Sequence, residues 1–125
     1  MTNVGTGRSR RLPTAVSDEL LNFEWQTEPG HARGTLNVGP ELGNRVGHVQ
    51  GGALFGAAAA AAEQAVGVPE ARLLDGHYQF LRPADGQTLA ASGELLRRGR
   101  RGAYAQARLS MEGRLVGIGL FGFRL

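Results

Sequence analysis

The stretch that decides the fold reads Gly47-His48-Val49-Gln50-Gly51-Gly52 and continues without a break from Ala53 to Val66. Paired glycines at the start of a long helix leave backbone N–H groups that point out of the first turn. Six consecutive alanines at residues 57–62 make the helix surface smooth, so that other elements can approach it closely. The stretch therefore predicts a helix whose start holds an anionic oxygen.

The composition limits the classes of protein to be considered. A chain of 125 residues with an ordinary apolar fraction of 42% is long enough for one folded domain and too short for two. It has no cysteine, which excludes disulfides, thiolate zinc sites and a cysteine nucleophile. All 14 basic residues are arginines, which excludes Schiff-base chemistry and a Walker lysine.

Charge and hydropathy bear on partners and location. The net charge is +3, and the arginines gather at residues 8–11 and 97–101. Nucleic acid is one partner for such clusters, but no aromatic residue interleaves either of them, and a phosphorylated small molecule fits as well. Because the sequence contains neither a run of about 18 apolar residues nor a hydrophobic signal core, we expect a cytoplasmic protein with no membrane or nucleic-acid partner.

The first third of the chain predicts a leader and a hairpin. Residues 1–13 offer little to bury and are expected to be disordered, whereas residues 14–125 are expected to form a single domain. A short helix is predicted to begin at Ser17. Alternation of apolar and polar residues predicts a strand over residues 23–28, and a return strand follows at residues 33–38.

The long helix is predicted from about Gly52 to Val66 and is ended by Gly67 and Pro69. A helix made mostly of alanine is usually surrounded by other elements rather than laid on a surface. The sequence therefore places it at the centre of the domain.

The remainder reads as a meander of strands. Residues 72–81 alternate, with Leu74, Tyr78 and Phe80 expected on one face and Asp75 and His77 on the other. An arginine-glycine turn is predicted at residues 97–102, between further strands at residues 88–96, 103–111 and 114–125. One helix after two strands and before four more predicts an α+β fold, in which a curled antiparallel sheet of five or six strands wraps one long central helix.

With these elements in place, the chain resembles the hotdog-fold thioesterases from about Phe23 to Leu125. Gln50-Gly51-Gly52 stands where phenylacetate-type thioesterases carry His-Gly-Gly, and residues 75–83 are closer to the acyl-CoA thioesterase II branch. The resemblance implies a homodimer whose two sheets join into one, with two sites at the interface, and a dimer of dimers as a further option. It also implies that the N–H group of Gly51 or Gly52 holds the thioester carbonyl, although paired glycines can also serve tight packing alone.

One departure from that family matters for catalysis. Counted from Gln50, the position where phenylacetate-type enzymes carry an acid falls on Ala59, which cannot serve as nucleophile or base. Glu63, one turn further, projects from the same helix face and is the first candidate for general base. Burial on an alanine helix favours a raised carboxylate pKa, which suits that role. The alternative is a solvated Glu63 near the helix end.

Three residues before the helix are supporting candidates. The resemblance implies that Asn44 helps to hold the water or the carbonyl, and Gln50 is a second residue for placing the water. His48 can act as acid or base near neutral pH. The alternative for Asn44 is a role in forming a turn. The alternative for His48 is a hydrogen-bonded or exposed position without a catalytic role.

The resemblance implies that coenzyme A is part of the substrate and that no separate cofactor takes part. Arg97, Arg98, Arg100 and Arg101 bracket Gly99 and are spaced to converge on its phosphates, unless they are merely solvated. Three scattered histidines do not predict a metal site.

The resulting prediction is an acyl-CoA thioesterase-like hydrolase that releases a carboxylic acid and free coenzyme A. Two other functions stay open. Ala59 favours a non-catalytic hotdog protein that binds acyl-CoA or another acyl ligand. A hotdog dehydratase or hydratase ranks last, because the paired histidine and carboxylate motifs of those enzymes are not found. The sequence does not identify the acyl chain, and it does not decide whether the carrier is coenzyme A or an acyl carrier protein.

Overall fold

The computed structural model describes residues 23–38 and 51–125. They form six strands and one helix, in the order β1 (Glu24–Glu28), β2 (His31–Asn37), α1 (Gly51–Val66), β3 (Arg72–Phe80), β4 (Thr88–Arg98), β5 (Gly102–Met111) and β6 (Arg114–Arg124). The elements predicted within these ranges are all present, with ends displaced by a few residues at most. The predicted leader at residues 1–13 and the helix at Ser17 lie outside the described residues.

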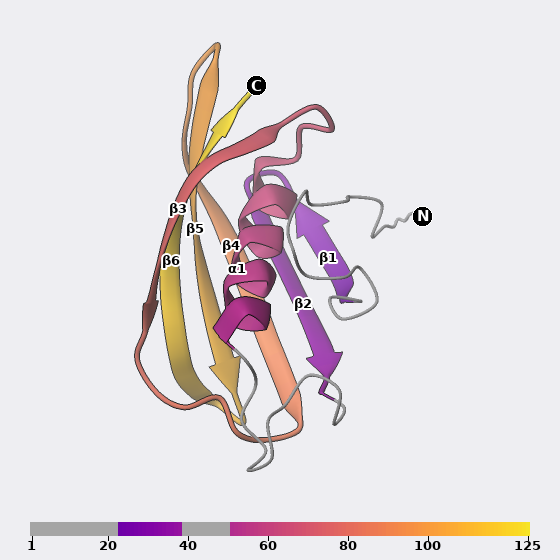
Figure 1. Cartoon of the computed structure of the whole chain (residues 1–125). Helices are drawn as coiled ribbons and strands as arrows, with labels where there is room; N and C mark the ends of the chain where they lie inside the picture. The colour runs from indigo at the N-terminus through magenta and orange to yellow at the C-terminus, as the bar shows by residue number, and fades with distance from the viewer. Residues whose placement is uncertain (1–22, 39–50) are drawn as a thin grey trace.

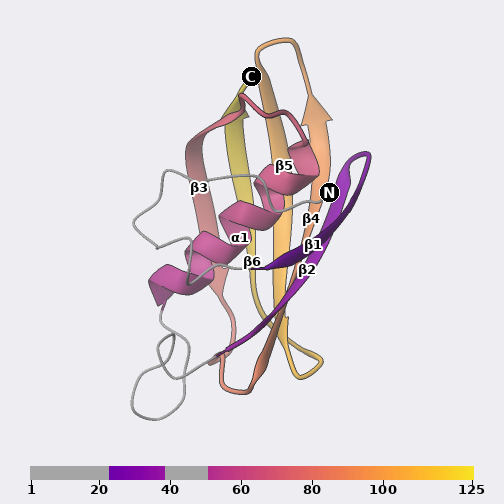
Figure 2. The same ribbon diagram turned by 90° about the vertical axis from the view of Figure 1, so that its right-hand side faces the viewer.

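The six strands make one antiparallel sheet in the order β1-β2-β4-β5-β6-β3. The sheet curls around α1, which lies on its concave side (Figures 1 and 2). The hairpin β1–β2 and the strand β3 therefore form the two edges. This arrangement confirms the predicted α+β fold with a sheet wrapped around a central helix.

Small residues on both surfaces bring the helix and the sheet together. The inward side chains of β5 opposite α1 are Ala103, Ala105 and Ala107, and all three are buried. They meet a helix whose buried positions are mostly alanine, so little side-chain volume separates the two backbones. Larger side chains fill the remaining space, where the core contains Phe23, Leu89, Leu109, Met111, Val116, Phe121 and Phe123.

The predicted facing of β3 is wrong at its first residues. A bulge between Leu73 and Asp75 inserts one residue, and the alternation of side chains shifts there. Leu73 consequently packs against the core, whereas Leu74 is 66% exposed. Beyond the bulge Tyr78 is buried, and Phe80 is about half exposed.

The predicted turn at residues 97–102 is also too long. β4 continues through Arg97 and Arg98, which pair with Tyr104 and Ala103 of β5. Only residues 99–101 remain between the strands, and the N–H of Gly99 donates a hydrogen bond to the Gly102 carbonyl at 2.8 Å. The register of the β4–β5 pairing shifts between Leu95 and Arg97, and the two strands remain paired beyond the last apolar residues of β4.

No helix in the described ranges is long and apolar enough to cross a membrane. The cytoplasmic location stays a prediction.

Candidate active site

The start of α1 offers exposed backbone donors. Gly51 and Gly52 are its first two residues, and both are exposed. The first four N–H groups of a helix have no partner within the helix, and the helix dipole places partial positive charge there. The first turn of α1 contains no acidic residue that would compete for those groups. The helix start can therefore hold an oxyanion.

The surroundings of the two glycines differ. A Cβ added at Gly51 would lie 3.4 Å from the Phe80 ring of β3, whereas a Cβ at Gly52 would meet no atom of the described residues within 4 Å. Packing within the described chain therefore does not require a glycine at position 52. Sequence reasoning placed Phe80 on a strand face but not beside the site, because only the tertiary structure brings the end of β3 to the start of α1.

Glu63 lies near the other end of the same helix. It is only 4% exposed, so the alternative of a solvated carboxylate is wrong. Gly51 and Glu63 are 12 positions apart, and at 1.5 Å of rise per residue the axial distance is about 18 Å. Ala59 is fully buried between them. One chain therefore does not bring the predicted carbonyl-binding group and the predicted base together.

The four arginines of residues 97–101 are exposed and lie at the far end of the sheet. Figure 1 shows the β4–β5 hairpin at the top of the molecule, whereas the first turn of α1 lies toward the bottom. The arginines and the glycines of a single chain are therefore also separated.

The candidates that precede the helix and the polar residues of β3 remain. Asn44, His48 and Gln50 lie outside the described residues, so their roles stay predictions. Asp75 and His77 are exposed on β3. Within residues 23–38 and 51–125 no group of three or more histidine, aspartate or glutamate side chains is placed to hold a metal ion.

Tyr78 was not predicted to have a polar role. Its side chain is 8% exposed, and its hydroxyl has no hydrogen-bond partner in the described part of the chain. Desolvation by burial raises the pKa of Tyr78 to about 12. The hydroxyl occupies the space that a Cβ at Gly117 would need, so a glycine in β6 is what allows the ring to lie inward.

Comparison with known protein families gives one match. The acyl-CoA thioesterase N-terminal domain family matches residues 40–123. A search of curated proteins finds no match.

Solved structures with the same fold include three bacterial proteins. A phenylacetic acid degradation-related protein from Ralstonia eutropha JMP134 superposes with a TM-score of 0.79 at 24% identity, covering 90% of this chain and 92% of that one. The Escherichia coli PaaI protein, from the phenylacetic acid degradation operon, gives 0.77 at 20% identity over 86% of each chain. A Bacillus halodurans protein solved with CoA gives 0.68 at 22% identity, over 73% of this chain and 68% of that one.

At these identities the three structures establish the fold, and the family match extends over more than half of the sequence. The chain is therefore a hotdog-fold protein that belongs to the acyl-CoA thioesterase N-terminal domain family.

Proposed function

We propose that the protein hydrolyses an acyl-CoA thioester to a carboxylic acid and free coenzyme A at the start of α1. The observation that carries this is the exposed helix start of Gly51 and Gly52, without an acidic residue in its first turn, in a chain of the acyl-CoA thioesterase family. N–H groups there would hold the oxyanion that forms when water adds to the carbonyl carbon. The carbon–sulfur bond then breaks, and the thiolate of coenzyme A leaves and takes a proton. No cofactor is needed beyond the substrate.

The attacking water needs a general base within hydrogen-bond reach. The axial distance of about 18 Å between Gly51 and Glu63 is far longer than a glutamate side chain. Glu63 of the same chain is therefore excluded as the base for a carbonyl held at Gly51. If Glu63 is the base, it must come from a second copy.

The edge strand β3 offers a way to bring in a second copy. Within the described residues β3 pairs only with β6, and it leaves Leu74 and Phe80 exposed, with Leu81 directly after it. An exposed apolar edge is a template for pairing with another chain. We propose that two β3 strands pair antiparallel about a two-fold axis and form one continuous sheet.

Antiparallel pairing reverses the ends of the two chains. The Phe80 end of β3, beside Gly51, then meets the Arg72 end of β3 in the second copy. Arg72 and Gly102 both lie opposite Arg124 in the sheet, so the arginine hairpin is at the Arg72 end. The last turn of α1 is at this end too (Figure 1). The pairing therefore carries Glu63 and the four arginines of one copy toward the helix start of the other.

The predicted division of labour follows from this arrangement. The glycine N–H groups of one copy polarise the carbonyl, and Glu63 of the second copy accepts a proton from the water. Asn44 or Gln50 positions that water. Arg97, Arg98, Arg100 and Arg101 of the second copy hold the phosphates of coenzyme A at the rim.

A thiol-release assay across short, medium, long and aryl acyl-CoAs tests the activity. Gly51→Pro removes the N–H at the first helical position, where proline is tolerated. Gly51→Ala is its matched control, because it keeps the N–H and adds only a Cβ. We expect kcat to fall roughly a hundredfold for Gly51→Pro and to change little for Gly51→Ala. Glu63→Gln should also abolish most of the activity, and retention of activity would reject Glu63 as the base.

Mixed dimers test whether the site is shared. Gly51→Pro and Glu63→Gln chains are each inactive alone, but a mixed dimer contains one site with both groups intact. Random mixing of equal amounts should restore about a quarter of the wild-type activity. No restoration, in mixtures shown to exchange subunits, would mean that each site is built from one chain.

The assay also separates the enzyme from a non-catalytic acyl-CoA-binding protein, which the buried Ala59 at the usual acid position favours. Saturable binding of acyl-CoA without turnover by the wild type would select that alternative.

A further inference from the structure

The convex face of the sheet, which lies opposite α1, presents a row of polar side chains that includes Arg33, Ser92 and Arg108. Arg33 of β2 lies opposite Ser92 of β4, and Ser92 lies opposite Arg108 of β5. Arg33 and Arg108 are exposed and Ser92 is partly buried. Because side chains alternate between the faces of a strand, all three project away from the buried Ala32, Ala91 and Ala107.

The surface is hollowed on both sides of this row. One hollow has a volume of about 450 Å³ and extends over Trp25, Thr35, Ala90 and Ser110. The other has a volume of about 340 Å³ and extends toward Glu28, His31 and Glu94. Arg33, Ser92 and Arg108 line both hollows. A ligand bound at the row would therefore have room on either side.

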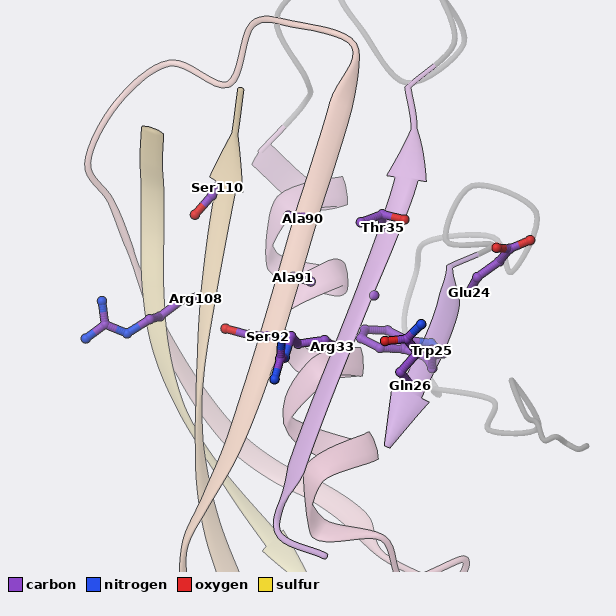
Figure 3. A pocket seen from close by; sticks show the side chains of 11 residues that line it. Glu24, Trp25, Gln26, Arg33, Thr35, Ala90, Ala91, Ser92, Arg108 and Ser110 are labelled. Carbon is purple, nitrogen blue, oxygen red and sulfur yellow. The ribbon is translucent and has the colours of Figure 1, made fainter. Parts of the chain in front are cut away.

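The two guanidinium groups share the hollows with three carboxylates, those of Glu24, Glu28 and Glu94. Neither Arg33 nor Arg108 makes a hydrogen bond or an ion pair within residues 23–38 and 51–125. Glu94, in the next row of the sheet, accepts a hydrogen bond from Gln106 Nε2 at 3.1 Å. Figure 3 shows the Glu24 carboxylate at the β1 edge, directed away from Ser92.

We propose that Arg33, Ser92 and Arg108 form a binding site for the phosphate oxyanion of a phosphorylated small molecule. Neighbouring strands are 4.7–4.9 Å apart, so the two arginines start about 10 Å from each other with the Ser92 hydroxyl between them. Two guanidinium forks and a hydroxyl are the donors that suit the tetrahedral oxygens of phosphate. The hydroxyls of Thr35 and Ser110 line the larger hollow, where the rest of the ligand would lie.

The side chains of Arg33 and Arg108 are oriented differently relative to Ser92. Figure 3 shows Arg33 running toward Ser92, whereas Arg108 extends away from it over β6. Exposed side chains exchange rotamers within nanoseconds, so Arg108 can turn back over Ser92 when an anion is present. In the proposed site Arg33 already lies beside Ser92, whereas Arg108 changes rotamer when the ligand binds. The site does not depend on hydrolysis at the helix start, because it lies on the other face of the sheet.

Binding of inorganic phosphate, followed by isothermal titration calorimetry at low ionic strength, tests the site. We expect saturable binding whose affinity falls with added chloride. Arg33→Gln and Arg108→Gln should each weaken it roughly tenfold, and Arg33→Lys should lose less than Arg33→Gln. Arg114→Gln, at the first residue of β6, removes the same charge elsewhere and should bind as the wild type does. Thermal melting of each variant verifies that the fold is retained.

Coenzyme A and 3′-dephospho-CoA identify the source of the phosphate. Competition by coenzyme A but not by its dephospho form would assign the site to the 3′-phosphate of a coenzyme A molecule bound at this face. Phosphate binding that persists with saturating coenzyme A would assign it to a separate phosphorylated ligand. Failure of the wild type to bind phosphate would overturn the proposal, and so would binding by Arg33→Gln and Arg108→Gln that is as tight as that of the wild type. A change in oligomeric state of these variants without phosphate binding would instead make this face a contact between copies of the chain.

Discussion

Gly93 of β4 lies directly against the backbone of Ala61 in α1. A Cβ built on Gly93 would be 2.6 Å from the Ala61 carbonyl carbon and 3.2 Å from the Ala62 nitrogen. Because both neighbours are backbone atoms, neither can move aside without displacing the helix. The absence of a side chain at one strand position therefore sets how closely the helix that bears the candidate site lies on the sheet.

Gly93→Ala should consequently lower the free energy of unfolding by about 3 kcal/mol, as overpacking against a backbone does. Urea denaturation monitored by circular dichroism measures this. Gly52→Ala is the control, since its Cβ would meet no described atom within 4 Å, and its stability should change by less than about 1 kcal/mol. Equal stability of Gly93→Ala and the wild type would contradict this account of helix placement.

Tyr78→Phe should raise the free energy of unfolding by about 1 kcal/mol at neutral pH, because it removes a buried hydroxyl that has no partner in the described chain. Tyr104→Phe, at an exposed position on β5, is the matched control and should have no effect. A clear loss of stability in Tyr78→Phe would mean that the hydroxyl is hydrogen-bonded.

The stability of the wild type should also depend on alkaline pH through Tyr78. Burial raises its pKa from 10.0 to about 12, so the folded state holds the phenolic proton more tightly than the unfolded state. This contribution is fully present below about pH 10 and is lost as the pH rises toward 12. Tyr78→Phe should show a smaller loss over the same range, in urea titrations at each pH.

Glu112 should produce a dependence of opposite sign in acid. Its carboxylate accepts hydrogen bonds from the Gln87 N–H at 2.8 Å and the Thr88 N–H at 3.1 Å, which lower its pKa, the Gln87 bond most. The stabilisation is present above the usual pKa of about 4.5 and is lost as the pH falls through the lowered value. Glu112→Gln should be less stable than the wild type at pH 7, and the difference should shrink as the pH falls below about 4.5. If the free energies of unfolding of the two proteins changed with pH in the same way, the hydrogen bonds from Gln87 and Thr88 to the Glu112 carboxylate would be excluded as the cause.

Leu74→Glu should convert the proposed dimer to a monomer, because it places a charge on the exposed edge strand. Light scattering after gel filtration measures the mass, and thiol release should fall with it. Leu120→Glu, exposed on the adjacent β6, leaves the edge unchanged and should remain at least a dimer. A dimeric Leu74→Glu protein would reject pairing through β3.

Arg97→Gln combined with Arg101→Gln should raise the KM for acyl-CoA roughly tenfold by removing charge-assisted phosphate contacts. The same variant should hydrolyse an acyl-pantetheine substrate, which lacks the nucleotide phosphates, with an unchanged KM. Equal effects on both substrates would show that these arginines do not act through the phosphates.

Part of the candidate site was predictable because its signals are local. Glycines at positions 51 and 52 followed by small residues predict a helix start, and the alternation at residues 103–111 predicts a strand; the structure contains both. The facing of Leu74 was wrong, because a bulge depends on how β3 pairs with β6 and leaves no mark in the periodicity of β3 itself.

The sequence by itself determined the helix, the order of the strands along the chain and the presence of a glutamate one turn beyond the usual acid position. These follow from short-range periodicity and from helix geometry. Only the tertiary structure decided that Phe80 lies beside Gly51, that Glu63 is buried, and that the arginine hairpin lies at the opposite end from the helix start. These relations arise from pairing between strands that are distant in the sequence. The positions of the candidate site residues relative to one another therefore depend on the folded sheet and cannot be derived from local sequence patterns.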